Sequence, residues 1–356
     1  MSPPAPLETL AADGPIPLSD YMAAAARAYY RRPRVFGAAG DFVTAPDICQ
    51  AFGELIGLWF ALRWQAEGRP GRFVLAECGP GRGTLIADAL RAAASVPGFA
   101  AAIDLHLVET SPTLRAAQAE ALKSRPAAWH DDWRDLPAGV PIHLVANEFL
   151  DALPIRRFRF TGKTWREIWV ERRGAGFAPC PGPAVEPPAG LLALTPRPPA
   201  EGDELEHGPE ALAFAAEIAR RIAGTGGAAL IFDYGYERTG YGDTLQAVAH
   251  HRRADPFAAP GAADITAHVN FEILATAARA AGARIAGPAG QGDWLVRMGL
   301  AARIERLAAR ATPAQARELI SGARRLAAPE AMGRLFKVLA LLPPGNGPKI
   351  IEGFAS

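Results

Sequence analysis

A glutamate followed by three glycines at alternating positions is the part of the sequence with the clearest chemical meaning. An apolar run that ends in Glu77 opens directly onto Gly79, Gly81 and Gly83. Glycine is needed where the backbone takes a positive φ or where a ligand approaches the main chain closely. A helix that follows such a turn presents unpaired N–H groups to the ligand. Residues 74–85 therefore predict a strand, a tight turn and a helix around a bound molecule.

The spacing of these glycines indicates which molecule would be bound. The pattern G-x-G-x-G lacks the extra residue of the dinucleotide-binding turn G-x-G-x-x-G. The carboxylate of Glu77 would repel a phosphate but would pair with an amino group. S-adenosyl-L-methionine carries an ammonium, a carboxylate and a ribose, so we interpret the turn as its site, with Thr84 placed to cap the helix. The alternative is a plain connection between a strand and a helix.

A second carboxylate supports the cofactor interpretation. Residues 103–110 alternate apolar and polar side chains, as a strand does, and lead to Glu109. A carboxylate at the end of the second parallel strand is where nucleotide-binding α/β folds hold the ribose hydroxyls. Asp132 and Trp133 follow the next strand region and could hydrogen-bond to adenine and stack on it. A surface loop with a half-buried tryptophan explains them equally well.

The order of elements predicts an α/β fold with a doubly wound, mostly parallel sheet. Helices are expected at 84–94 and 112–124, between strands at 74–78, 103–109 and 141–154. A further buried strand is expected at 227–236. Residues 155–172 alternate around a Gly-Lys turn, which predicts an antiparallel hairpin outside this sheet. Residues 174–203 are rich in proline and glycine, and they are expected to form a long surface connection with one short strand at 191–195.

Composition excludes several classes of protein. The 356 residues carry a net charge of only +1, which gives no electrostatic footprint for nucleic acid, and no apolar run reaches the roughly 18 residues of a membrane span. The three cysteines, Cys49, Cys78 and Cys180, are widely spaced and form no metal-binding pattern. They suggest a reducing compartment. The N-terminal residues are acidic and lack arginine, so we expect a cytoplasmic location.

Several long motifs together resemble the MidA family of S-adenosylmethionine-dependent methyltransferases. They occur in order from about residue 18 to residue 343: GDFVTAPDICQAFGELIGLWF, ECGPGRGTL, VANEFLDALPIRRF, LIFDYGY, DTLQAVAHHRRADPFAAPGAADITAHVNF and FKVLALLP. The resemblance implies a class I, Rossmann-like methyltransferase fold with inserted cap segments. Mitochondrial members of the family are protein-arginine methyltransferases that assist assembly of respiratory complex I. It therefore implies a protein substrate, with a complex I subunit as the candidate.

The resemblance also organises the chain into expected parts. These are a flexible arm (1–17), a helical lid segment (18–70), a methyltransferase core (71–154 and 227–343), an inserted hairpin and Pro/Gly-rich cap (155–205), and a returning helix (206–226). By the same resemblance, Gly40, Asp41, Phe42 and Thr44 would fold over the cofactor as a lid. A helix-capping loop accounts for Thr44 equally well.

Candidate catalytic residues lie at the end of the strand expected at 141–154. Arginine is protonated in water, so a site that methylates it should hold the guanidinium with carboxylates and localise its charge on the nitrogens that do not attack. Asn147, Glu148 and Asp151 are the candidates, with Glu148 and Asp151 as a clamp. The alternative for both carboxylates is stabilisation of a helix N-terminus. His268 is a candidate proton acceptor and Asp264 a residue that could orient it, although a lone histidine in a loop is more often structural.

Other functions stay open at this point. The chain could be an assembly chaperone that binds the cofactor without turnover, or a methyltransferase for small molecules. An NAD-dependent oxidoreductase is disfavoured by the spacing of the glycine turn. The apolar helix expected at 48–60 could be core or the seam of a homodimer, because periodicity does not separate these.

Overall fold

The computed structural model describes residues 9–30, 44–123, 125–174, 176–249, 252–345 and 350–355. The chain forms two compact units. The first unit comprises Met1–Phe42, Leu150–Ala213 and Tyr236–Leu274, and the second comprises Val43–Phe149, Phe214–Gly235 and Ala275–Ser356. Residues 1–8 of the expected N-terminal arm lie outside the described residues.

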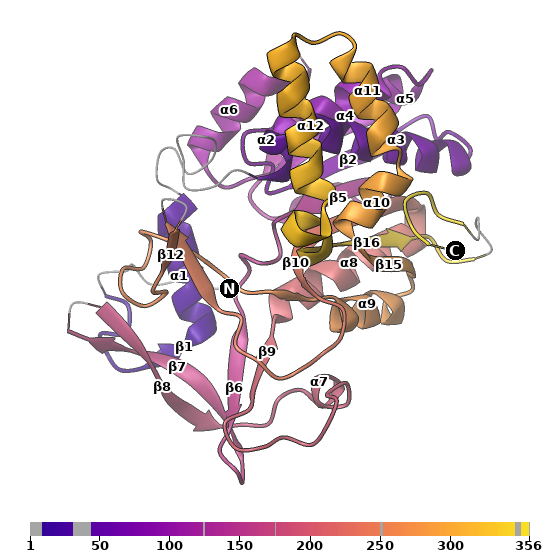
Figure 1. Cartoon of the computed structure of the whole chain (residues 1–356). Helices are drawn as coiled ribbons and strands as arrows, with labels where there is room; N and C mark the ends of the chain where they lie inside the picture. The colour runs from indigo at the N-terminus through magenta and orange to yellow at the C-terminus, as the bar shows by residue number, and fades with distance from the viewer. Residues whose placement is uncertain are drawn as a thin grey trace. The chain divides into compact units, whose positions relative to one another are not determined.

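The second unit is built on a mostly parallel sheet, which confirms the predicted fold class (Figure 1). The strand order is β15-β16-β10-β5-β2-β3-β4, in which β4, β3, β2, β5 and β10 run parallel, β16 runs antiparallel to β10, and β15 runs antiparallel to β16. The strands are β2 (Phe73–Cys78), β3 (Ile103–Val108), β4 (Ala128–His130), β5 (Ile142–Asn147), β10 (Gly227–Tyr236), β15 (Arg284–Gly290) and β16 (Phe336–Leu342).

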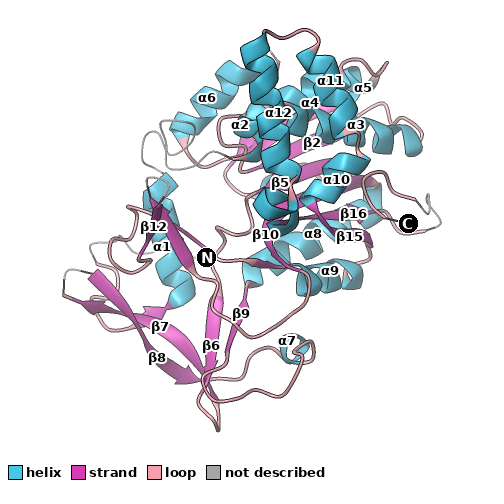
Figure 2. Cartoon of the chain, in the orientation of Figure 1, coloured by secondary structure: helices cyan, strands magenta, loops and turns pink. Residues whose placement is uncertain are grey.

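Helices pack on both sides of this sheet (Figure 2). They are α2 (Ala45–Ile48), α3 (Ala51–Ala66), α4 (Thr84–Ala93), α5 (Phe99–Ala102), α6 (Pro112–Leu122), η1 (Trp133–Asp135), α8 (Pro209–Thr225), α9 (Phe271–Ala280), α10 (Gln291–Arg297), α11 (Leu300–Ala308), α12 (Pro313–Ala327) and η2 (Pro329–Gly333). The helix predicted from residue 48 begins instead at Ala51, because Cys49 is extended, with φ −155° and ψ 121°, and separates α2 from α3. None of the described helices combines the length and apolar character that a membrane crossing requires.

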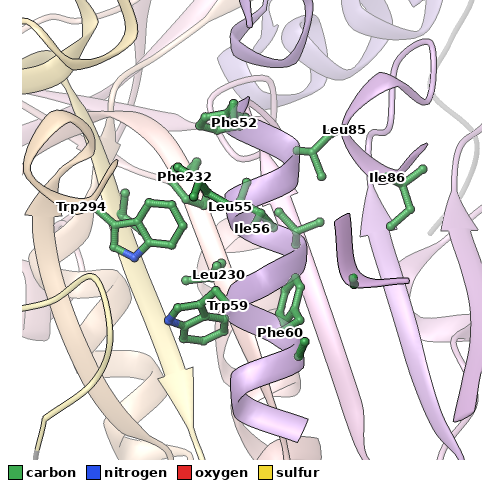
Figure 3. Close-up of a cluster of buried hydrophobic side chains, with 14 of the residues drawn as sticks. Phe52, Leu55, Ile56, Trp59, Phe60, Leu85, Ile86, Leu230, Phe232 and Trp294 are labelled. Atoms are coloured by element: carbon green, nitrogen blue, oxygen red, sulfur yellow. The ribbon is translucent and has the colours of Figure 1, made fainter. Parts of the chain in front are cut away.

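The α3 helix forms the centre of the core in the second unit (Figure 3). Its apolar side chains point in several directions, as expected for a helix that is surrounded by other elements. Those of Phe52, Leu55, Ile56, Trp59 and Phe60 are at most 2% exposed. Their partners include Leu230 and Phe232 on β10 and Trp294 on α10. These residues are therefore core, and the alternative that this helix forms a dimer seam is wrong.

The α3 and α4 helices approach each other closely at glycine. A Cβ atom on Gly57 would lie 2.2 Å from the backbone oxygen of Ala89, and one on Gly53 would lie 2.7 Å from that of Leu85. Backbone atoms cannot move aside as a flexible side chain can. Glycine at these positions therefore permits the packing that holds α4 beside α3.

The first unit contains antiparallel sheets. Strand β1 (Ile16–Pro17) pairs with β7 (Trp165–Arg173), which also pairs with β6 (Arg156–Phe160) and with β8 (Gly176–Ala184), while β6 pairs with β9 (Glu204–His207). A small sheet consists of β11 (Gln246–Ala249), β12 (Arg252–Ala254) and β13 (Asp264–Thr266). The other elements are α1 (Leu18–Tyr30), α7 (Ala189–Leu192) and β14 (Val269–Asn270).

The predicted hairpin at 155–172 is confirmed by the β6–β7 pair, but two other predictions for this region were wrong. Residues 174–203 were expected to be a long connection, yet β8 occupies part of them. Its prolines are tolerated because β8 pairs with a neighbour along one side only. A short strand was expected at 191–195, where the structure has the end of α7.

The close approach at Gly57 leads to a stability prediction. Gly57→Ala should lower the free energy of unfolding by about 1–3 kcal/mol, because the added methyl group overpacks the contact with Ala89. Gly224→Ala on α8 is the matched control, since no heavy atom lies within 4 Å of its added Cβ. Urea denaturation should show the control unchanged or slightly stabilised. Equal unfolding midpoints for the two variants would contradict the packing argument.

Candidate cofactor and active site

The glycine turn between β2 and α4 has the backbone that the sequence predicts. Gly79, Gly81 and Gly83 have φ values of 66°, 52° and 79°. A Cβ atom would lie 3.1 Å from the Phe149 ring at Gly79 and 3.2 Å from the Cα atom of Gln118 at Gly83. Both conformation and space therefore favour glycine. The turn ends at Gly83, the N-cap of α4, which makes no side-chain capping bond to the first N–H groups of that helix.

The Glu77 side chain fits a bound ammonium group. It lies at the carboxyl end of β2 and is 2% exposed. Its Oε2 atom has no hydrogen-bond partner among the described residues. Burial raises the pKa of Glu77 to about 8, although a hydrogen bond from the Ile86 backbone acts in the opposite direction. A buried carboxylate in this state is costly, and a cation supplied by a ligand would offset that cost.

Glu109 is connected to the glycine turn through Gln118, a residue that the sequence analysis missed. The Glu109 carboxylate accepts hydrogen bonds from Ser111 N at 2.8 Å and from Gln118 Nε2 at 3.3 Å. Gln118 Nε2 also donates to the Gly81 carbonyl at 2.8 Å. Gln118 is fully buried, and the indole of Trp129 donates to its Oε1 atom. The signal in the sequence that could have identified Gln118 is a glutamine on the inner side of the helix predicted at 112–124.

Asp132 and Trp133 make contacts within the second unit that compete with the predicted adenine contacts. Asp132 caps η1 by accepting from Arg134 N at 2.9 Å, and it also binds the Arg134 guanidinium. That guanidinium lies 4.0 Å from the centre of the Trp133 ring. Trp133 is 6% exposed and also contacts Phe214 edge-on. Adenine stacking on Trp133 would require Arg134 to move, and it stays a prediction.

Thr84 does not cap α4, so that prediction was wrong. Gly83 is the N-cap and leaves Thr84 inside the helix. The Thr84 hydroxyl instead donates to Asp47 Oδ1 on α2 at 3.1 Å. Thr44 occupies the N-cap of α2, but its side chain makes no capping hydrogen bond. The other predicted lid residues, Gly40, Asp41 and Phe42, lie outside the described residues.

Glu148 lies at the same sheet edge as the glycine turn, because β5 is the parallel neighbour of β2 and Cys78 pairs with Ala146. Its φ of 50° is unusual for a residue with a side chain, and such strain is often found at functional sites. Its Oε1 atom accepts from Asn147 Nδ2 and from Ala45 N, both at 3.3 Å. The Glu148 charge therefore lies at the N-terminus of a helix, which is the alternative role given for it in the sequence analysis. That helix is α2, which begins at Ala45.

Two polar contacts thus hold α2 beside the cofactor turn. Asp47 accepts a hydrogen bond from the Thr84 hydroxyl, and Glu148 accepts one from the first N–H group of α2. Asn147 is 7% exposed, and its Oδ1 atom has no partner among the residues that the structure describes. It is a second polar atom that a ligand at this edge could satisfy. The sequence analysis did not identify Asp47, because its partner lies 37 residues away.

Asp151 and His268 belong to the first unit, whereas Glu148 belongs to the second. Asp151 is 6% exposed, and its backbone oxygen accepts from Ala267 N. The proposed orienting residue Asp264 binds the Tyr30 hydroxyl at 3.0 and 3.1 Å. His268 N donates to Thr244 Oγ1, and burial followed by the charge of Arg253 lowers the pKa of the His268 ring. The catalytic roles of Asp151 and His268 stay predictions.

Comparison with known proteins identifies the family. Residues 55–289 match the model of the family described as "Putative S-adenosyl-L-methionine-dependent methyltransferase". The chain is 36% identical to the mitochondrial protein arginine methyltransferase NDUFAF7 of Mus musculus, over 93% of this chain and 81% of that protein. It is 35% identical to the Homo sapiens protein of the same name, over 93% and 80%.

The structural comparison agrees with the sequence relatives. A Burkholderia thailandensis protein of the COG1565 superfamily, bound to S-adenosyl-homocysteine in its crystal structure, matches with a TM-score of 0.78. The match has 28% sequence identity and covers 97% of this chain and 92% of that one.

These relatives also correct one prediction. A cytoplasmic location was expected, but the Mus musculus, Drosophila melanogaster and Homo sapiens relatives are named as mitochondrial proteins. The composition of the N-terminal residues was therefore a poor guide to compartment. The family match and the relatives show that the chain belongs to the MidA-like family of S-adenosyl-L-methionine-dependent methyltransferases.

Proposed function

We propose that this protein methylates arginine side chains of a protein substrate. The observation that carries the proposal is the similarity, over 93% of the chain, to relatives named protein arginine methyltransferases. The family resemblance noted in the sequence further favours a subunit of respiratory complex I as the substrate, with methylation assisting assembly of the complex. The buried Glu77 carboxylate beneath the glycine turn is consistent with a bound amino-acid cofactor.

The residues around the turn would hold the cofactor in a fixed orientation. S-adenosyl-L-methionine, when bound, supplies a methyl group on a sulfonium that a nucleophile can displace in line. Glu77 would bind the ammonium group of the cofactor. The N–H groups of the turn and of the start of α4 would donate hydrogen bonds to the cofactor's carboxylate, and Glu109 would hold the ribose hydroxyls. Gln118 would fix the position of the Glu109 carboxylate relative to the glycine turn, because it hydrogen-bonds to both Glu109 and Gly81.

Glu148 would hold the acceptor guanidinium. A carboxylate hydrogen-bonded to two guanidinium nitrogens localises positive charge there and leaves the third nitrogen better able to attack. Positioning of that nitrogen supplies a large part of the acceleration. Its place at the end of β5, next to the turn, makes Glu148 the best supported of the candidate catalytic residues. Asn147, Asp151 and His268 are to be tested individually.

Binding of S-adenosylhomocysteine should depend on pH through Glu77. The carboxyl group is protonated below about pH 8 in the free protein, so binding an ammonium there must release a proton. Affinity should therefore rise by up to about tenfold per pH unit between roughly pH 6 and 8, and then level off. Calorimetry in buffers of different ionisation enthalpy measures both the affinity and the proton release.

Glu77→Gln should remove this dependence and weaken binding at pH 8 by roughly 100-fold, as expected for loss of a buried charge-assisted hydrogen bond. Glu120→Gln on the exposed side of α6 is the matched control and should bind as the native protein does. A native affinity that does not change between pH 6 and 8 would show that Glu77 does not bind the ammonium.

Glu148→Gln tests the catalytic proposal, because the amide oxygen can still accept from Ala45 N while the charge is removed. Methyl transfer should fall by about 100-fold or more, and affinity for S-adenosylhomocysteine should change by less than about threefold. The assay follows radiolabelled methyl groups into proteins of an extract that lacks the native enzyme. Acid hydrolysis of the labelled protein should yield methylarginine.

The other outcomes of this assay distinguish the alternatives. Full activity of Glu148→Gln would exclude Glu148 as the guanidinium ligand. Label found only in small molecules would overturn the protein-arginine proposal. Cofactor binding without any transfer by the native protein would favour a chaperone role.

A further inference from the structure

A cavity in the first unit has no role in the methyltransferase site described above. It has a volume of about 550 Å³, and its lining residues come from the end of β6, the start of β7 and the segment that contains α7. Its lining includes Phe160, Trp165, Glu186, Leu192, Arg197 and Pro199. The volume is typical of a binding site for a small ligand or a few residues of a peptide.

The floor of this cavity, here called the insertion pocket, is aromatic and well packed. Trp165 is 2% exposed, and its ring contacts Phe160 at 5.2 Å and stacks with Tyr241 at 6.3 Å. Leu191 and Leu205 are buried beside Trp165 in the same cluster. The apolar surface is therefore held in place before any ligand arrives, which lowers the entropy cost of binding.

Of the two charged residues that line the insertion pocket, Arg197 has a partner within the protein and Glu186 has none among the described residues. The Arg197 guanidinium binds both oxygens of Asp203, at 2.5 and 2.9 Å, and lies 4.7 Å from the centre of the Tyr241 ring. Its charge is thus matched within the protein. Glu186 has no ion pair or hydrogen bond among the described side chains. A complementary ligand would therefore carry a positive charge next to an apolar stem.

We propose that the insertion pocket binds a basic segment of the polypeptide substrate, at a position apart from the residue that is methylated. An arginine or lysine side chain would lay its methylene groups against Phe160 and Leu192 and place its charge at Glu186. Long basic side chains combine these two properties. The inference rests on the proposed function, because it takes a polypeptide as the substrate.

The test is peptide binding to the full-length protein without turnover. The probe is a fluorescein-labelled peptide, Gly-Leu-Arg-Leu-Gly, and its comparison peptide carries citrulline in place of arginine, which removes the charge but keeps the shape. The arginine peptide should bind saturably below about 1 mM and at least about fivefold more tightly than the citrulline peptide. Raising the salt concentration should reduce this difference.

Variants locate the binding site. Glu186→Lys should weaken binding of the arginine peptide by about tenfold, and Glu201→Gln, an exposed control outside the lining, should leave it unchanged. Leu192→Ser should weaken both peptides. Affinity for S-adenosylhomocysteine and the thermal unfolding midpoint should stay at native values in Glu186→Lys, which shows that the variant is folded.

Several results would overturn the proposal. They are no saturable binding, equal affinity for the two peptides, or a Glu186→Lys variant that binds as the native protein does. Binding that is lost in Glu148→Gln but kept in Glu186→Lys would place the peptide at the methylation site and also overturn it. Failure of this proposal can be distinguished from failure of the proposed function. Peptide binding is measured without methyl transfer, and methyl transfer is measured without this peptide.

Discussion

The buried carboxylate of Glu77 is the constraint on which the cofactor site depends. A carboxylate removed from water without a partner is unstable, and its pKa is accordingly raised to about 8. Near neutral pH the free protein therefore holds this group mostly as the neutral acid. A ligand ammonium can restore the charge, and the turn with its three left-handed glycines leaves the backbone open to that ligand. The site thus places a buried carboxylate, which a positive charge would stabilise, beside the N-terminus of α4.

The parallel sheet brings the other groups to this carboxylate. Strands β3, β2 and β5 are neighbours, so their carboxyl ends place Glu109, the glycine turn and Glu148 along one edge. Hydrogen bonds then tie the loops together. Gln118 joins Glu109 to Gly81, while Asp47 and Glu148 hold α2. The close packing of α3 on α4 supports the helix that begins at the turn.

The first unit contributes a different kind of surface. Its antiparallel strands carry aromatic rings and many charged residues, of which most described pairs are matched, as in the contacts between Arg157 and Glu204 and between Arg197 and Asp203. Glu186 differs from these residues, because it lines the insertion pocket without a partner among the described residues. For the transfer reaction, a methyltransferase core has to bind only the cofactor and the acceptor atom. Selection among protein substrates requires further contacts on a surface outside that core.

The sequence alone determined the parallel core, the glycine turn and the carboxylates Glu77, Glu109 and Glu148, because strand periodicity, glycine spacing and the ends of strands are local properties. Only the tertiary structure decided the contacts of Gln118, the pairing of Thr84 with Asp47 and the break at Cys49. It also decided that β8 forms despite its prolines. The contacts of Gln118 with Gly81 and of Thr84 with Asp47 each join residues that are 37 positions apart, and no local pattern encodes their proximity. The burial that raises the pKa of Glu77 arises in the same way, since it is produced by packing and not by the residues next to it.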